Sequence, residues 1–170
     1  MKKKYVTLVL IFLIIILIFL SLNFLSIHVL QILDYTSDNL VFQETICPGE
    51  HFSLKYTHSV AQTPVWEFFE IAKNGDLILV ETHFLDHGAG LPYTSFGDEV
   101  FVNEQGKFKI KNMSRKISLP LFYRIGKRRE NFFIYKNQEI NLSKILGDSV
   151  VIINITKMNL FNYFINKFII

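Results

Sequence analysis

The sequence predicts a small, mainly β protein, an antiparallel β-barrel or sandwich, preceded by one transmembrane helix and followed by a short amphipathic helix. Two observations support this prediction: an uncharged apolar run near the N-terminus, and short alternating or β-branched runs separated by turn residues from residue 40 onward. At 170 residues the chain has room for one domain besides its ends. We expect a basic end over residues 1–4, a transmembrane anchor over 5–27, a stalk over 28–39, a β domain over 40–156 and an amphipathic tail over 157–170.

The N-terminal apolar run has the length and composition of a membrane span. No charged side chain occurs between Tyr5 and Leu33, and residues 5–22 would extend about 27 Å as a helix, close to the thickness of the bilayer hydrocarbon. A cleaved signal sequence is the alternative, but it would need a shorter apolar region followed by small residues. Lysines at positions 2–4 precede the run, so the positive-inside rule keeps the N-terminus in the cytoplasm. The sequence therefore predicts a single-pass protein of the cell membrane, with the lipid bilayer as a partner and the C-terminal domain outside.

The formal net charge of +3 equals the contribution of these three lysines, so the rest of the chain is balanced. One later basic run, Lys127-Arg128-Arg129, has no aromatic residues at stacking spacing and is interpreted as a solvated turn. Nucleic acid is therefore not expected as a partner. Cys47 is the only cysteine, which excludes an intrachain disulfide.

From residue 40 the pattern is that of short strands. The segment FSLKYTH alternates with period two, and the segments PVWEFFEIA and LILVETHF are joined by KNGD, a hairpin signal in which Asn74-Gly75 is expected to form a two-residue type I′ turn. Such a turn would place Glu67 opposite Thr82 and Phe69 opposite Val80. Further strand-like runs are KFKIKN, LFYRI, NFFIYKN and SVVIINIT.

The C-terminal tail has a different period. Asn159, Asn162 and Asn166 recur at helical spacing among apolar residues, which predicts a short amphipathic helix, too short to span a bilayer. Its position stays open between the membrane surface, the sheet and a disordered end.

Two ionisable residues, His58 and Glu67, lie within this apolar pattern. If residues 59–64 form a wider hairpin loop, His58 lies opposite Val65 and Tyr56 opposite Glu67, so that His58 and Glu67 become diagonal neighbours on the core face. A structural polar pair is one interpretation, since a hydrogen-bonded partner offsets part of the cost of burying a carboxylate. A ligand site or catalytic site is the other.

The segments YTHSVAQTPVWEFFEI and LVETHFLDHGAGLP together resemble the bacterial domain of unknown function family 1850. The resemblance covers roughly residues 40–155, and its Y-x-H-S-V-x-x-x-P-V-x-E and G-A-G-L-P motifs map onto Tyr56, His58, Ser59, Val60, Pro64, Val65, Glu67, Gly88, Ala89, Gly90, Leu91 and Pro92. The resemblance implies a small protein whose gene often lies beside those of TAXI-type TRAP transporters, which take up organic acids. It implies no established activity.

The chemistry of these motifs favours binding over catalysis. His83, Asp86 and His87, with Glu81 nearby, offer metal ligands within too short a stretch for a typical zinc site, so no metal is expected. Adjacent residues on a strand point in different directions, so His58 is not expected to activate Ser59, and no catalytic residue or cofactor is expected. Amides of Gly88 to Gly90 are candidates for an anion-binding nest, the alternative being a tight structural turn.

The sequence therefore predicts a non-enzymatic, membrane-anchored extracytoplasmic accessory protein, with TRAP transporter subunits as partners implied by the resemblance. The candidate binding residues are His58, Ser59, Glu67, Gly88 and Gly90. The alternative function is a small-ligand or metal-binding envelope enzyme that uses His58, Glu67 and the loop from Gly88 to Pro92.

Overall fold

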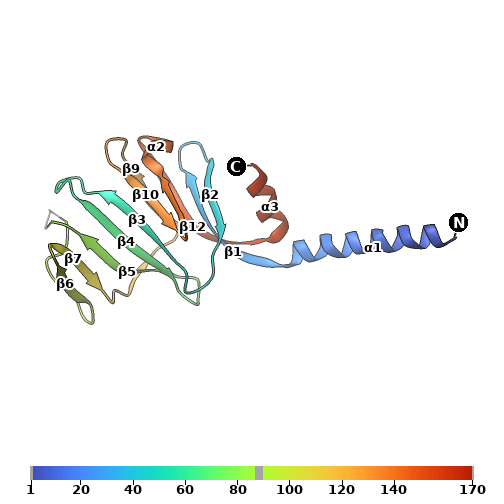
Figure 1. The fold of residues 1–170 in the computed structure, drawn as a ribbon, viewed down its shortest axis with the longest axis horizontal. Coiled ribbons are helices and arrows are strands. Elements are labelled where there is room, and N and C mark those ends of the chain that lie inside the picture. The colour runs from blue at the N-terminus through green and yellow to red at the C-terminus, as the bar shows by residue number, and fades with distance from the viewer. Residues whose placement is uncertain (1, 87–89, 170) are drawn as a thin grey trace.

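The computed structural model describes residues 2–86 and 90–169, and it shows a β-sandwich from which one long helix extends (Figure 1). The predicted binding residue Gly88 lies outside the described residues, as do His87 and Ala89. All strand pairs are antiparallel.

Two sheets make up the sandwich. The smaller has the strand order β2-β1-β12-β9 and consists of β1 (Ser26–Asp34), β2 (Leu40–Thr45), β9 (Leu121–Ile125) and β12 (Ser149–Asn159). The larger has the order β11-β10-β3-β4-β5-β7-β6, with β8 paired to β5, and consists of β3 (His51–Thr57), β4 (Pro64–Ile71), β5 (Leu77–Phe84), β6 (Val100–Glu104), β7 (Lys107–Lys111), β8 (Arg115–Ile117), β10 (Asn131–Tyr135) and β11 (Gln138–Asn141). A short helix, α2 (Leu142–Leu146), connects β11 to β12.

The main core lies between the two sheets. Leu30 and Ile32 of the smaller sheet and Phe52 and Phe133 of the larger sheet belong to one buried cluster. A second, smaller cluster around Phe84 lies at the β5–β7 end of the larger sheet. The predicted mainly β fold is thus confirmed, and of the two expected architectures the sheets form a sandwich and do not close into a barrel.

The N-terminal helix α1 (Lys2–Phe24) extends from the sandwich and is long and apolar enough to cross a membrane. The stalk expected over residues 28–39 is wrong, because β1 occupies most of it and is a central strand between β2 and β12. Leu30 and Ile32 enter the core, while Val29 and Gln31 on the other face are also buried. A strand buried on both faces has no polar alternation, so its sequence could not be distinguished from the preceding apolar helix. The β unit consequently spans residues 26–159 and not 40–156.

The C-terminal helix α3 (Leu160–Ile169) packs on the outer face of the smaller sheet. The side chain of Tyr163 is buried, its backbone oxygen accepts a hydrogen bond from Gln43 Nε2 at 3.0 Å, and Lys167 Nζ lies 3.0 Å from Glu44 Oε1. At its beginning the helix also contacts α1, where the rings of Phe161 and Phe19 meet edge to face at 5.4 Å. Of the positions left open for the tail, packing on the sheet is the one found.

The β4–β5 hairpin has a different turn from the one expected. Ala72 N donates to Asp76 O at 2.9 Å and only Gly75 in the turn has a positive φ, so the loop has three residues and not two. This shifts the expected pairing of Phe69 from Val80 to Leu79. A bulge at Val80 then restores the expected register, in which Glu67 pairs with Thr82.

Candidate functional site

The predicted pair of His58 and Glu67 does not form. His58 lies just beyond the end of β3, where its backbone N donates to Thr63 O at 2.9 Å and closes the loop that leads to β4. Its ring Nδ1 accepts hydrogen bonds from the backbone N of Val60 at 3.3 Å and of Ala61 at 3.1 Å. His58 therefore organises the turn through a local capping interaction.

A difference in register explains why the two residues stay apart. Thr57 pairs with Pro64 and Tyr56 with Val65, a shift of two residues from the expected pairing of Tyr56 with Glu67. The loop is thus shorter than assumed, and Tyr56 takes the diagonal position beside Glu67 that was expected for His58. An even shift leaves the side chains of β3 and β4 on their predicted faces, and Phe52, Leu54, Phe69 and Ile71 are core residues as expected. On β5 the prediction was wrong, because the longer turn places Leu77 in the core where Ile78 was expected.

Glu67 contacts a tyrosine. The hydroxyl of Tyr56 donates to Glu67 Oε1 at 3.4 Å, and both side chains are partly buried on the core face of the larger sheet. In the described part of the chain, no lysine, arginine or histidine forms an ion pair with the Glu67 carboxylate. Burial raises the pKa of Glu67, and the hydrogen bond from Tyr56 opposes this only in part.

The polar cluster extends across the sandwich to the other sheet. The ring of Tyr123, on β9, meets that of Tyr56 at 6.2 Å, and its hydroxyl donates to Asn131 Oδ1 at 3.1 Å. Burial raises the pKa of both tyrosines, and the nearby charge of Glu67 adds to the effect. Both hydroxyls therefore stay protonated as donors at any physiological pH. We refer to Tyr56, Glu67, Tyr123 and Asn131 as the tyrosine–glutamate cluster.

Asn131 ties this cluster to the β9–β10 turn and to α2. Its side chain is almost fully buried, and Nδ2 donates to Arg129 O at 2.9 Å and to Ser143 Oγ at 2.8 Å. All polar atoms of the amide are thus used within the fold. The sequence analysis did not find Tyr123, Asn131 or Ser143, because they lie far along the chain from the motif and in no recognisable pattern.

Replacing Asn131 with alanine is expected to lower the free energy of unfolding by about 1–3 kcal/mol, since the hydroxyl of Tyr123 would lose its acceptor and the carbonyl of Arg129 one of its two donors. Chemical denaturation of the detergent-solubilised chain measures this loss. The matched control is Asn162→Ala on the exposed side of α3, for which we expect a change of no more than about 0.5 kcal/mol. Equal effects of the two substitutions would contradict a structural role for the buried amide.

The remaining predicted binding residues lie elsewhere. Ser59 is exposed in the loop that follows His58, with its carbonyl accepting from Gln62 Nε2 at 2.6 Å. Gly90 is exposed with φ of +88°, a conformation that favours glycine, and Leu91 after it is buried in the smaller core cluster. The described end of the glycine loop is therefore anchored by packing. Of the predicted binding residues that the structure describes, Glu67 contacts Tyr56, and His58 contacts the backbone of its own loop.

The residues considered for a metal site are only partly assembled. His83 Nε2 and Glu81 Oε1 lie 2.6 Å apart, and the ring of His83 packs on Phe68 at 4.8 Å. Among the described residues, no group of three or more histidine, cysteine, aspartate or glutamate side chains is placed to hold a metal ion.

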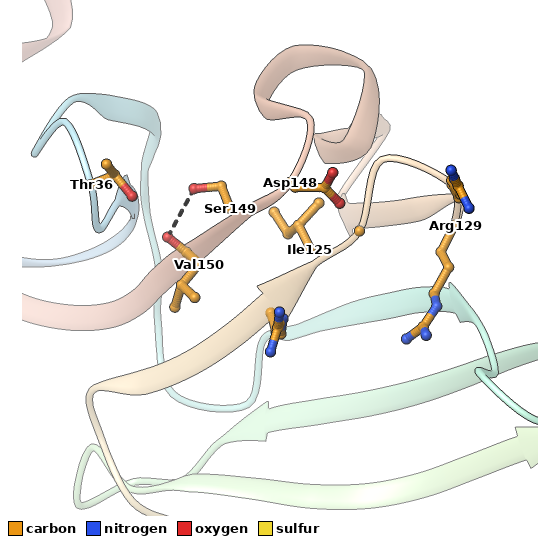
Figure 2. Close-up of a pocket in the computed structure, with 9 residues that line it drawn as sticks. Thr36, Ile125, Arg129, Asp148, Ser149 and Val150 are labelled. Atoms are coloured by element: carbon orange, nitrogen blue, oxygen red, sulfur yellow. Dashed lines mark hydrogen bonds between the residues drawn. The ribbon is translucent and has the colours of Figure 1, made fainter.

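A cavity of about 840 Å³ opens at the end of the sandwich where β9 turns into β10. Figure 2 shows Ile125 and Arg129 on one side of it, Asp148, Ser149 and Val150 on the segment that enters β12, and Thr36 on the turn after β1. Arg124 and Arg128 complete the charged lining. We refer to it as the arginine cavity. Its residues come from three distant segments, so no sequence motif predicted it.

The comparisons with known proteins give one match. The family described as "Domain of unknown function (DUF1850)" matches residues 52–142, which is more than half of the chain and includes β3, β4, β5 and the cluster residues Tyr56, Glu67, Tyr123 and Asn131. No curated protein and no solved structure matches the chain at a significant level. The resemblance seen in the two motifs is thus confirmed, and the chain belongs to the DUF1850 family.

Proposed function

We propose that this protein is a single-pass membrane protein whose β-sandwich lies outside the cell membrane and serves there as an accessory subunit of a TRAP-type organic acid uptake system. The observation that carries the proposal is the direct connection between the apolar helix and the sandwich. Leu25 is the only residue between α1 and β1, and β1 is a central strand of its sheet. A domain attached in this way stays close to the bilayer surface, where it meets other membrane proteins.

The junction is held in place by the C-terminal helix. Leu25 O accepts a hydrogen bond from Leu160 N at 3.0 Å, and Phe161 packs against Phe19 of α1. Cleavage of α1 as a signal sequence would remove the contact between Phe19 and Phe161, so this packing supports a retained anchor.

Exposed apolar side chains occur on both helices. Phe24 is 83% exposed, and on α3 Phe168 is 89% exposed, with Phe164 and Ile165 also exposed. Aromatic and aliphatic side chains at the end of a membrane span fit the boundary between headgroups and hydrocarbon. This supports the lipid bilayer as a partner of both helices.

The protein partner is proposed from the resemblance to the family, whose description assigns no function. Genes of such proteins often lie beside those of TAXI-type TRAP transporters, and a rigid domain at the bilayer surface is suited to contact a transporter embedded in the same membrane. The enzyme alternative is not favoured, because His58 and Glu67, the two side chains on which it depends, make separate contacts in the fold.

Cys47 offers a direct test of topology, because it is the only cysteine and its side chain is exposed on the sandwich. We expect a membrane-impermeant maleimide to label the full-length protein in intact protoplasts. The matched control carries Cys47→Ser and Lys3→Cys, which moves the single thiol to the other side of α1, and should be labelled only after permeabilisation. The reverse pattern, or recovery of the protein in the soluble fraction, would contradict the proposed topology.

The transporter link has its own test. We expect TRAP transporter subunits to co-purify with the detergent-solubilised full-length chain, and deletion of its gene to reduce organic acid uptake. The control is an unrelated single-pass protein of similar size, expressed at the same level. Unchanged uptake together with a purified chain free of transporter subunits would disprove this partner while leaving the membrane topology intact.

A further inference from the structure

The arginine cavity combines a small-molecule volume with an excess of positive charge. Its volume of about 840 Å³ lies within the range of roughly 300–1,000 Å³ that is typical of small-ligand pockets. The charged residues in its lining are Arg124, Arg128, Arg129 and a single acid, Asp148. Two formal positive charges are thus unbalanced within the lining.

The three guanidinium groups have no carboxylate partner among the described residues. In the part of the chain that the structure describes, none of them lies within ion-pair distance of an aspartate or glutamate. Arg115, on the larger sheet, shows the contrast, because it forms a bidentate pair with Glu99 at 2.8 and 2.9 Å. The cavity therefore retains donors that an anion could use.

The one acid in the lining has another role. Asp148 Oδ1 accepts a hydrogen bond from the backbone N of Lys127 at 2.7 Å, which holds the β9–β10 turn in place. The hydroxyl of Ser149 donates to Asp34, and this bond is the main cause of the lowered pKa of Asp34. Because the proton of the Ser149 hydroxyl is used in the bond to Asp34, the donors that remain for a ligand are the guanidinium groups and the hydroxyl of Thr36.

The turn that carries these arginines is well supported. Arg129 N donates to Gly126 O at 3.0 Å, and the carbonyl of Arg129 accepts from Asn131 Nδ2 and from Ser143 Oγ. Lys127 and Lys144 line a neighbouring cavity of about 410 Å³, together with Arg128, Arg129 and one acid, Glu130. The basic run is indeed a turn, and its backbone is fixed by hydrogen bonds from the side chains of Asn131 and Ser143.

The cavity lies at the opposite end of β1 from α1. β1 begins beside α1 and ends at Asp34, next to the cavity, and its nine residues span roughly 30 Å. In Figure 1 the turns that form the cavity lie at the edge of the sandwich away from α1. A soluble ligand fits this position.

We propose that the arginine cavity binds a small organic or inorganic anion that carries at least two carboxylate or phosphate groups. Arginine forms paired hydrogen bonds with both groups, and two separate acidic groups would engage more than one guanidinium at a time. A monocarboxylate would engage only one of them. The proposal does not depend on the transporter partner, because it concerns the purified protein alone.

Isothermal titration calorimetry of the full-length protein in detergent tests this proposal. The ligands are citrate, succinate, pyrophosphate and, as a monovalent reference, acetate, all at constant ionic strength because salt screens such contacts. We expect saturable binding of at least one polyvalent anion, and binding of acetate weaker by about tenfold or more. Tighter binding of the carboxylates or of pyrophosphate identifies the acidic group of the natural ligand.

Matched variants separate the cavity from general charge. Arg128→Gln with Arg129→Gln is expected to weaken binding of the polyvalent anion by at least about tenfold. The control, Lys73→Gln with Lys157→Gln, removes the same charge at two exposed sites outside the cavity lining and should leave the affinity unchanged. Circular dichroism verifies that both variants are folded. Absence of saturable binding, or equal losses in the two variants, would overturn the proposal.

Discussion

Replacing Phe133 with alanine is expected to lower the free energy of unfolding by about 3–5 kcal/mol. Phe133 is fully buried on β10, and its ring lies 4.9 Å from that of Phe42 in the opposite sheet and 5.5 Å from that of Phe52 on the neighbouring strand. Truncation would remove contacts within its own sheet and between the two sheets, and the flanking strands are too constrained to fill the space. Because folded domains are stable by only about 5–15 kcal/mol, this loss is a large part of the total.

Phe122→Ala is the matched control for this substitution. Phe122 lies on β9 and is 57% exposed, with a single edge-to-face contact to Tyr35 at 5.8 Å. Its truncation should cost no more than about 1 kcal/mol. Urea denaturation of both variants in detergent gives the two free energies, and similar values would mean that the rings between the sheets do not hold the sandwich together.

The local features of the motif region could be predicted from the sequence. Alternation identified Phe52 and Leu54 as core residues of β3, and both are buried. The dipeptide Asn74-Gly75 located the β4–β5 turn, although the turn has one more residue than expected. Such features depend on neighbours within a few residues, and those neighbours determine strand period and turn position directly.

Features that depend on the length of a loop or on distant strands could not be predicted. The loop after His58 closes on Thr63, two residues earlier than assumed, and this alone exchanges His58 for Tyr56 as the partner of Glu67. The strand β1 pairs with β12, more than 100 residues later, and nothing local signals that contact. The arginine cavity likewise requires the β1–β2 turn, β9 and β12 to meet.

Glu67→Gln is expected to raise the temperature of unfolding above pH 7 by roughly 2–8 °C, the change that about 1 kcal/mol produces in domains of this size. Burial raises the pKa of Glu67 above its ordinary value of 4.5, so the folded chain holds a proton that the unfolded chain has already lost. The contribution of Glu67 to stability is therefore fully present below pH 4.5 and is lost as the pH rises through the pKa of Glu67 in the fold. Glutamine keeps an oxygen that accepts from the Tyr56 hydroxyl and carries no charge at any pH.

Thermal unfolding measured from pH 4 to pH 9 distinguishes this explanation from a general charge effect. The wild type should lose stability relative to Glu67→Gln as the pH increases, whereas Glu139→Gln, at an exposed position on β11, should follow the wild type throughout. Parallel curves for Glu67→Gln and the wild type would mean that the carboxylate is ionised at no cost, which would require a cation near it. If the wild type does lose stability as the pH rises, the motif contains a carboxylate that destabilises the fold and has no ion-pair partner among the described residues. Its presence would be explained by a role of its charge or proton, and not by a contribution to stability.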